Sequence, residues 1–133
     1  MPPDARLSYV SIFTRDVASL PSFYVDVFGL EEVASSRSDR YRELAVGEMM
    51  LGFPFVDAYG LLDMAYQAEP TGVRSMMTFA VGDIAEVNRL TARAEAHGGR
   101  IAKPPFATGF GQVLSVVLDP EGNALRISTT SSE

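Results

Sequence analysis

The sequence of 133 residues contains no cysteine and only one histidine. Without cysteine the protein has no disulfide bond, thiolate metal ligand or cysteine nucleophile, which is compatible with a reducing compartment. No apolar run approaches the roughly 18 to 20 residues that span a bilayer. The first residues, MPPDARLSYV, lack the basic-then-apolar order of a signal peptide. These absences predict a soluble protein of the cytoplasm.

Positive charge is scarce as well. The 11 Lys and Arg residues are scattered, and the net charge is -6. Because a phosphate backbone must be met by clustered cations, we expect neither nucleic acid nor an anionic membrane as a partner. The hydrophobic content of 47% and the length suffice to bury a sizeable core in a single domain, residues 1–133, built from two small halves.

An internal repeat defines the two halves. Residues 9–33 read as an alternating strand, then Asp16 near a helix start, then an amphipathic helix. Residues 76–101 repeat that order, with Asp83 in the place of Asp16 at an offset of 83 − 16 = 67. The simplest interpretation is two copies of one β-α unit.

Each repeat is followed by strand-forming sequence. The first helix precedes SRSDRYRELAVGEMMLGFPF, with a turn at Gly47, and the second precedes a Pro- and Gly-rich loop, KPPFATGFG, and two strands around DPEGN. Each half is therefore predicted to be βαβββ, with modules at about residues 7–55 and 73–129.

The modules are separated by residues 56–72. A connection longer than about 12 to 15 residues is more often a linker or a functional lid than idle structure. The aromatic residues Tyr59 and Tyr66 in this segment, with Phe55 just before it, suit a lid over something apolar. A linker that crosses between the halves and packs on the core explains them equally well.

Three stretches occur in an order typical of one protein family: YVSIFTRDVASLPSFYVDVFGLE, then FAVGDIAEV with HGG, then GFGQVLSVVLDPEGNALRI. Together they resemble the vicinal oxygen chelate superfamily, also called the glyoxalase/bleomycin resistance protein/extradiol dioxygenase superfamily. The resemblance covers nearly the whole chain. It implies an α+β fold in which two βαβββ modules form a curled, cup-shaped mixed sheet with the helices outside.

Enzymes of this superfamily usually hold a divalent metal with His and Glu side chains on four strands of the cup. The resemblance places Tyr9 and Met76 at the two His positions, and it places Arg126 and a residue near Leu51 at the two Glu positions. Methionine is a poor ligand for a hard divalent ion, leucine is none, tyrosine is uncommon, and arginine is positively charged. The sequence therefore predicts a member that lacks the usual ligands, with no metal and no cofactor.

The remaining candidate ligands have local roles. His97 ends a predicted helix, where a cation favours the helix dipole and the following glycines suit a left-handed cap. The carboxylates of Asp16, Asp83, Asp119 and Glu121 lie at helix starts or turns, where they stabilise the backbone.

Strand alternation assigns side chains to the two faces of the predicted sheet. Leu125 and Ile127 point towards the helices, so Arg126 faces the cup. Arg126 either anchors a carboxylate, phenolate or polarised carbonyl of a ligand, or pairs with a carboxylate near the rim, or extends out along its own apolar stem. The cup-facing residues predicted to bind a ligand are Tyr9, Ser11, Phe13, Leu51, Phe53, Met76, Thr78 and Arg126.

Two functions fit this pattern. The first is metal-independent binding of a small, largely apolar or aromatic molecule, resembling the drug-sequestering resistance proteins of the superfamily. The second is a metal-free isomerase, lyase or cyclase of an aromatic or polyketide-like compound, with Tyr9 as the acid and Arg126 as the oxyanion stabiliser. No base in the cup is evident from the sequence, which favours binding over catalysis.

Assembly follows from the same resemblance. The superfamily commonly completes its cups across an interface, and a curled sheet has edges to protect, so a homodimer is expected. A family member that mainly dimerises and has no other activity is a third hypothesis.

Overall fold

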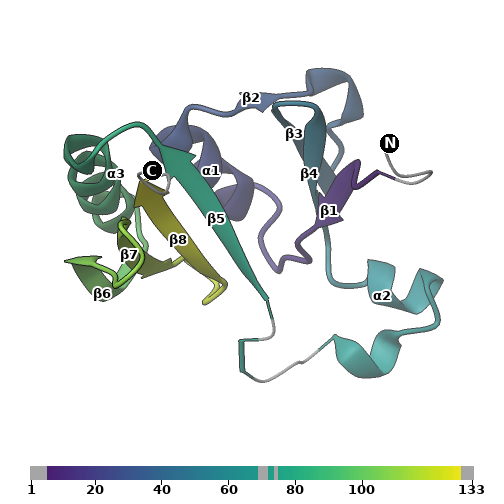
Figure 1. Ribbon diagram of the computed structural model, residues 1–133. Helices are drawn as coiled ribbons and strands as arrows, with labels where there is room; N and C mark the ends of the chain where they lie inside the picture. Colours follow the sequence, from purple (N-terminus) through teal and green to yellow (C-terminus); the bar gives the residue numbers. More distant parts are fainter. Residues whose placement is uncertain (1–5, 69–71, 74, 130–133) are drawn as a thin grey trace. The chain divides into compact units, whose positions relative to one another are not determined.

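The computed structural model describes residues 6–68, 72–73 and 75–129. The chain divides into two compact units, residues 1–70 and 71–133. Each unit contains one strand, a helix and three further strands, as Figure 1 shows. The predicted α+β fold of two βαβββ modules is therefore confirmed.

The first unit contains a four-stranded sheet with the order β1-β4-β3-β2. Strand β1 runs parallel to β4, and the other neighbours are antiparallel. The elements are β1 (Tyr9–Ser11), α1 (Ser19–Phe28), β2 (Glu31–Glu32), a 3-10 turn (Ala34–Ser36), β3 (Tyr41–Val46), β4 (Met49–Pro54), α2 (Ala58–Leu61) and a second 3-10 turn (Ala65–Gln67).

The second unit repeats this topology with the order β5-β8-β7-β6. Strand β5 runs parallel to β8, just as β1 does to β4. The elements are β5 (Met76–Val81), α3 (Ile84–Ala96), β6 (Arg100–Ala107), β7 (Val113–Leu118) and β8 (Ala124–Thr129). The offset of 67 residues thus relates two strands with the same place in two sheets.

The repeated aspartates lie near the starts of both long helices: Asp83 is the N-cap residue of α3, and Asp16 lies three residues before Ser19, where α1 begins. The Asp16 carboxylate accepts hydrogen bonds from the backbone amides of Ala18 and Ser19, the latter at 2.8 Å. Asp83 caps α3 by accepting from the Glu86 amide at 2.9 Å. These bonds satisfy amides that have no partner within the first turn. None of the helices among the described residues is long and apolar enough to cross a membrane.

In each unit a helix packs on one face of the sheet, and side chains such as Tyr9 and Arg126 are exposed on the other. In the second unit Val117, Leu125 and Ile127 are fully buried beside α3, whose Val87 and Ala94 are also fully buried. Figure 1 shows α3 beside the β6, β7 and β8 strands of this sheet. We call the sheet face away from α3 or α1 the open face of its unit.

The helix-covered face of the first unit is rich in aromatic side chains. Tyr24 of α1 and Phe53 of β4 are fully buried, with ring centroids 5.6 Å apart. Leu20 of α1 and Leu44 of β3 are fully buried as well. Burying side chains of this size contributes on the order of 1.5 to 3 kcal/mol each.

A charged network ties the start of α1 to the sheet. Arg42 lies on the helix-covered face, pairs with Glu32 and donates to the Ala18 carbonyl at 3.2 Å. Arg37 makes a two-pronged contact to the same carboxylate, with both N–O distances at 2.7 Å. Hydrogen bonds from Arg37 and then Arg42 lower the pKa of Glu32 to about 2.

This network predicts how stability depends on acidity. Since the folded pKa of Glu32 lies below its ordinary value of 4.5, its contribution is complete above pH 4.5 and is lost as the pH falls towards 2. We expect Glu32→Gln to lower the free energy of unfolding at pH 7, and the gap to wild type to close between pH 4.5 and 2. Urea unfolding at several pH values measures this gap. Glu48→Gln, on an exposed turn residue, is the control; a pH-independent gap for Glu32→Gln would contradict the prediction.

Candidate functional site

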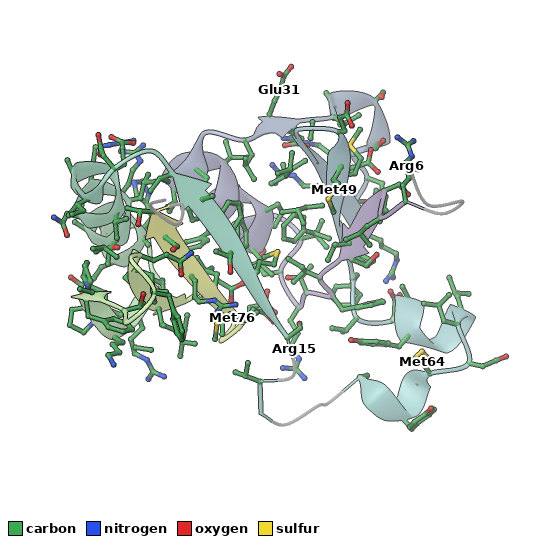
Figure 2. All side chains as sticks on the ribbon, in the orientation of Figure 1. Arg6, Arg15, Glu31, Met49, Met64 and Met76 are labelled. Atoms are coloured by element: carbon green, nitrogen blue, oxygen red, sulfur yellow. The ribbon has the colours of Figure 1, made fainter. Side chains whose placement is uncertain are left out.

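The open face of the second unit presents polar and cationic side chains beside apolar ones. Thr78, Arg126 and Val116 lie opposite one another on β5, β8 and β7. Met76 lies two residues before Thr78 on the same face of β5, and Figure 2 labels it there. Sequence alternation predicted this side for Met76, Thr78 and Arg126, and the structure places all three together.

Arg126 is exposed on this face and has no ionic partner among the described residues. Its Nε donates to the Thr78 hydroxyl at 3.1 Å, which orients the guanidinium. The four strands of this sheet contain no Asp or Glu. A guanidinium donates through five N–H groups in a fixed fork, so donors remain for a ligand.

A second cation lies on the next strand. Lys103 of β6 pairs in register with Val116, and its Nζ lies 3.8 Å from the centroid of the Phe106 ring. Sequence analysis missed this residue because it assigned KPPFATGFG to a loop. The structure corrects that assignment, since β6 continues to Ala107 through two register shifts. Strand β6 is at an edge of its sheet, where the missing amides of Pro104 and Pro105 are tolerated.

The open face of the first unit carries a hydroxyl–carboxylate cluster, which consists of Tyr9, Tyr41, Ser36 and Glu43. The Tyr41 hydroxyl donates to Glu43 Oε1 at 2.8 Å, and the Ser36 hydroxyl donates to Oε2 at 3.4 Å. The Tyr9 side chain also hydrogen-bonds to Glu43. Glu43 thus brings a proton acceptor to the face on which sequence analysis expected none.

The phenol of Tyr9 holds its proton unusually firmly. Burial of the hydroxyl, together with the hydrogen bond to the Glu43 carboxylate and its charge, raises the pKa of Tyr9 to about 12. Desolvation and a nearby negative charge both disfavour the phenolate. Tyr9 is therefore a hydrogen-bond donor or a proton donor at neutral pH, not a base.

Two of the predicted ligand-binding residues lie on the other face. Leu51 is 4% exposed, and Phe53 is fully buried with its ring beside Tyr24 of α1. Strand register places Gly52, between them, opposite Ser11 on the open face. The expectation that Leu51 and Phe53 line the open face is therefore wrong. Along β4 the assignment of faces is shifted by one residue.

Phe13 is occupied by a contact within its own unit. Its ring stacks on Tyr59 of α2 with centroids 3.8 Å apart and planes 18° from parallel. Burial raises the pKa of Tyr59. Tyr66, by contrast, is 78% exposed. One aromatic residue of segment 56–72 therefore packs on the first unit as a linker does, and whether this segment closes over a ligand stays a prediction.

The positions that usually hold metal do not fit a divalent ion. The register that pairs Thr78 with Arg126 pairs Ser11 with Gly52, so Gly52, and not Leu51, is the structural counterpart of Arg126. Gly52 has no side chain and Arg126 carries a positively charged guanidinium, so neither residue provides a ligand atom for a metal. No three His, Cys, Asp or Glu residues cluster to hold a metal ion within the described ranges.

Comparison with known proteins agrees with the topology. The chain matches the model of the Glyoxalase/Bleomycin resistance protein/Dioxygenase superfamily over residues 6–127. It is similar to a structure described as a glyoxalase/bleomycin resistance protein/dioxygenase family enzyme from Burkholderia phytofirmans PsJN, with 38% identity and a TM-score of 0.90. That match covers 94% of this chain and 98% of the other.

More distant structures share the fold alone. A lactoylglutathione lyase from Agrobacterium tumefaciens is 24% identical with a TM-score of 0.72, covering 97% of this chain and 96% of that one. TioX from Micromonospora sp. ML1 is 18% identical with a TM-score of 0.65, covering 94% and 98%. No curated protein matches the chain. Because the family model spans residues 6–127, the chain belongs to the glyoxalase/bleomycin resistance protein/dioxygenase superfamily.

Proposed function

We propose that this protein binds a small, largely apolar or aromatic molecule through an anionic or carbonyl group, without a metal. The observation that supports this proposal is Arg126, a cation on an open sheet face with no ionic partner among the described residues. Thr78 holds its Nε at 3.1 Å, so the two terminal amino groups are oriented for a carboxylate or a carbonyl oxygen.

The neighbours of Arg126 suit the rest of such a ligand. Met76 and Val116 offer apolar surface near the guanidinium of Arg126. Methionine adapts its shape to irregular partners and makes favourable contacts with aromatic rings. Lys103 and Phe106 add a second cation and an aromatic ring on the neighbouring strand. The face therefore supports a flat apolar body with a negative or polarised end.

A metal-free isomerase, lyase or cyclase is the second candidate function. One observation favours it: Tyr9 and Glu43 provide a proton donor and a proton acceptor on the same open face. General acid–base chemistry needs both kinds of group within hydrogen-bond reach of the substrate. Product formation from a candidate substrate in the presence of EDTA would favour this function over binding alone.

We expect Arg126→Ala to weaken binding of 1-naphthoate about tenfold, because a charge-assisted hydrogen bond is lost at an accessible position. Arg126→Lys should recover part of the loss, since a point charge does not reproduce the planar fork. The neutral isostere 1-naphthalenemethanol should bind equally to all three proteins. Isothermal titration calorimetry measures the affinities.

The matched control for this change is Arg89→Ala. Arg89 lies on α3, exposed and paired with Glu86, so its removal changes the same charge in the same unit away from the open face. Unchanged 1-naphthoate affinity in Arg126→Ala, or an equal loss in Arg89→Ala, would contradict the proposal. A large loss of Tm with unchanged affinity would identify Arg126 as a structural residue.

Metal independence gives a separate prediction. Purified protein should contain well under one equivalent of Ni, Zn, Fe or Mn per chain, because neither Gly52 nor Arg126 provides a ligand atom. Added metal should leave the Tm unchanged, since only a ligand that binds the native state stabilises it. Inductively coupled plasma mass spectrometry and thermal shift measure these quantities. Stoichiometric metal would show that other residues form a site.

We also propose that the protein acts as a homodimer, with the small molecule as its ligand and no nucleic acid or membrane partner. The net charge of -6 supports the exclusion of polyanions. Static light scattering at micromolar concentration should give twice the chain mass of 14.4 kDa. A mass of one chain under these conditions would refute the dimer. A cytoplasmic location stays a prediction.

A further inference from the structure

The strands of the first unit place negative charge on its open face and no cation. Register puts Glu31 and Glu43 on this face, and Figure 2 shows Glu31 extending away from β2. Arg42, the only cation in these four strands, lies on the helix-covered face opposite Phe53 and pairs there with Glu32. The face thus has the opposite charge to the open face of the second unit.

Glu43 is hydrogen-bonded by neutral groups only. Its described partners are the hydroxyls of Tyr9, Tyr41 and Ser36, and none of the ion pairs between described residues involves it. Hydroxyl donors satisfy carboxylate lone pairs without supplying a positive charge. The two tyrosines also place aromatic rings beside the carboxylate, and Tyr9 is 38% exposed.

We propose that Tyr9, Tyr41 and Glu43 form a binding site for an organic ammonium ion on the open face of the first unit. A carboxylate beside aromatic rings attracts an ammonium group by charge, by hydrogen bonding and by cation–π contact. The net charge of -6 favours the approach of a cation. The proposal uses residues of the first unit alone and does not depend on the function proposed for Arg126.

The cluster exists because β4 has no side chain at Gly52. A methyl group on Gly52 would lie 2.6 Å from the Tyr41 hydroxyl and 2.7 Å from Cε1 of Tyr9, and it would overlap the Tyr9 hydroxyl. Real Cβ atoms essentially never make such contacts. Gly52 is therefore a positioning residue, because it lets tyrosines from β1 and β3 reach over β4 to one carboxylate.

The test compares benzylammonium with its neutral analogue benzyl alcohol by calorimetry at pH 7. We expect the unsubstituted protein to prefer benzylammonium by about tenfold, from charge and cation–π attraction at a partly exposed site. Glu43→Gln keeps the shape of the side chain, so it should remove this preference while leaving the fold intact. Glu48→Gln, which removes the same charge from an exposed turn of the same unit, should keep the preference within about twofold.

Gly52→Ala provides the second variant. It should abolish the preference for benzylammonium and bring the pKa of Tyr9 down from about 12 towards 10, as followed by ultraviolet titration against Tyr9→Phe. Equal affinity of the native protein for the two probes, or a preference that survives in Glu43→Gln, would overturn the proposal. Binding of 1-naphthoate is measured on the same variants. Unchanged 1-naphthoate affinity shows that a variant has lost amine selectivity without losing binding at Arg126.

Discussion

The parallel pairing of the first and last strand of each unit determines where every candidate residue lies. It brings Ser11 beside Gly52 and Thr78 beside Arg126, although each pair is separated by about 40 residues or more of chain. A parallel neighbour requires a long crossover, and the helix and two strands between the paired strands provide it. Once this pairing is fixed, alternation along each strand decides which side chains meet the helix and which remain accessible.

The two units share one strand topology, but their open faces carry charges of opposite sign. At corresponding positions of the two open faces, Gly52 leaves room for hydroxyls around Glu43, whereas Arg126 presents a guanidinium held by Thr78. Neither charge is neutralised by an ion pair among the residues described. Leaving two charges uncompensated on accessible surfaces costs little in water, where the solvent screens them, so the fold tolerates it.

Much of this arrangement follows from the sequence, because the repeat at Asp16 and Asp83 fixes equivalent helices and hence equivalent strands. The orientation of Arg126 was predictable for a simple reason. It is a single polar residue between Leu125 and Ile127, so the contrast between the two faces is sharp. The approximate helix starts were predictable because an aspartate that accepts hydrogen bonds from nearby backbone amides is a local signal; Asp83 caps α3, and Asp16 closes the turn just before α1.

The side-chain orientations of the first unit were harder to predict, because its strands lack this contrast between polar and apolar positions. In MMLGFPF every residue is apolar, glycine or proline, so nothing in the string distinguishes the face of Phe53 from that of Gly52. In YRELAV the polar residues Arg42 and Glu43 point to opposite faces. Arg42 is tolerated on the helix-covered side, where its side chain is 11% exposed, because Glu32 neutralises it. That contact between separate strands is tertiary information, and alternation alone therefore missed Tyr41 and Glu43.

The two prolines in β6 have a consequence for how this protein behaves when concentrated. An outer strand with a continuous ladder of free amides and carbonyls recruits strands from other molecules and seeds aggregates. Pro104 and Pro105 are two consecutive residues without a backbone amide, and the register shifts around them distort the strand further. Strand β6 is thereby a poor template for intermolecular sheet growth, which keeps a sheet rich in valine and isoleucine from polymerising along this side.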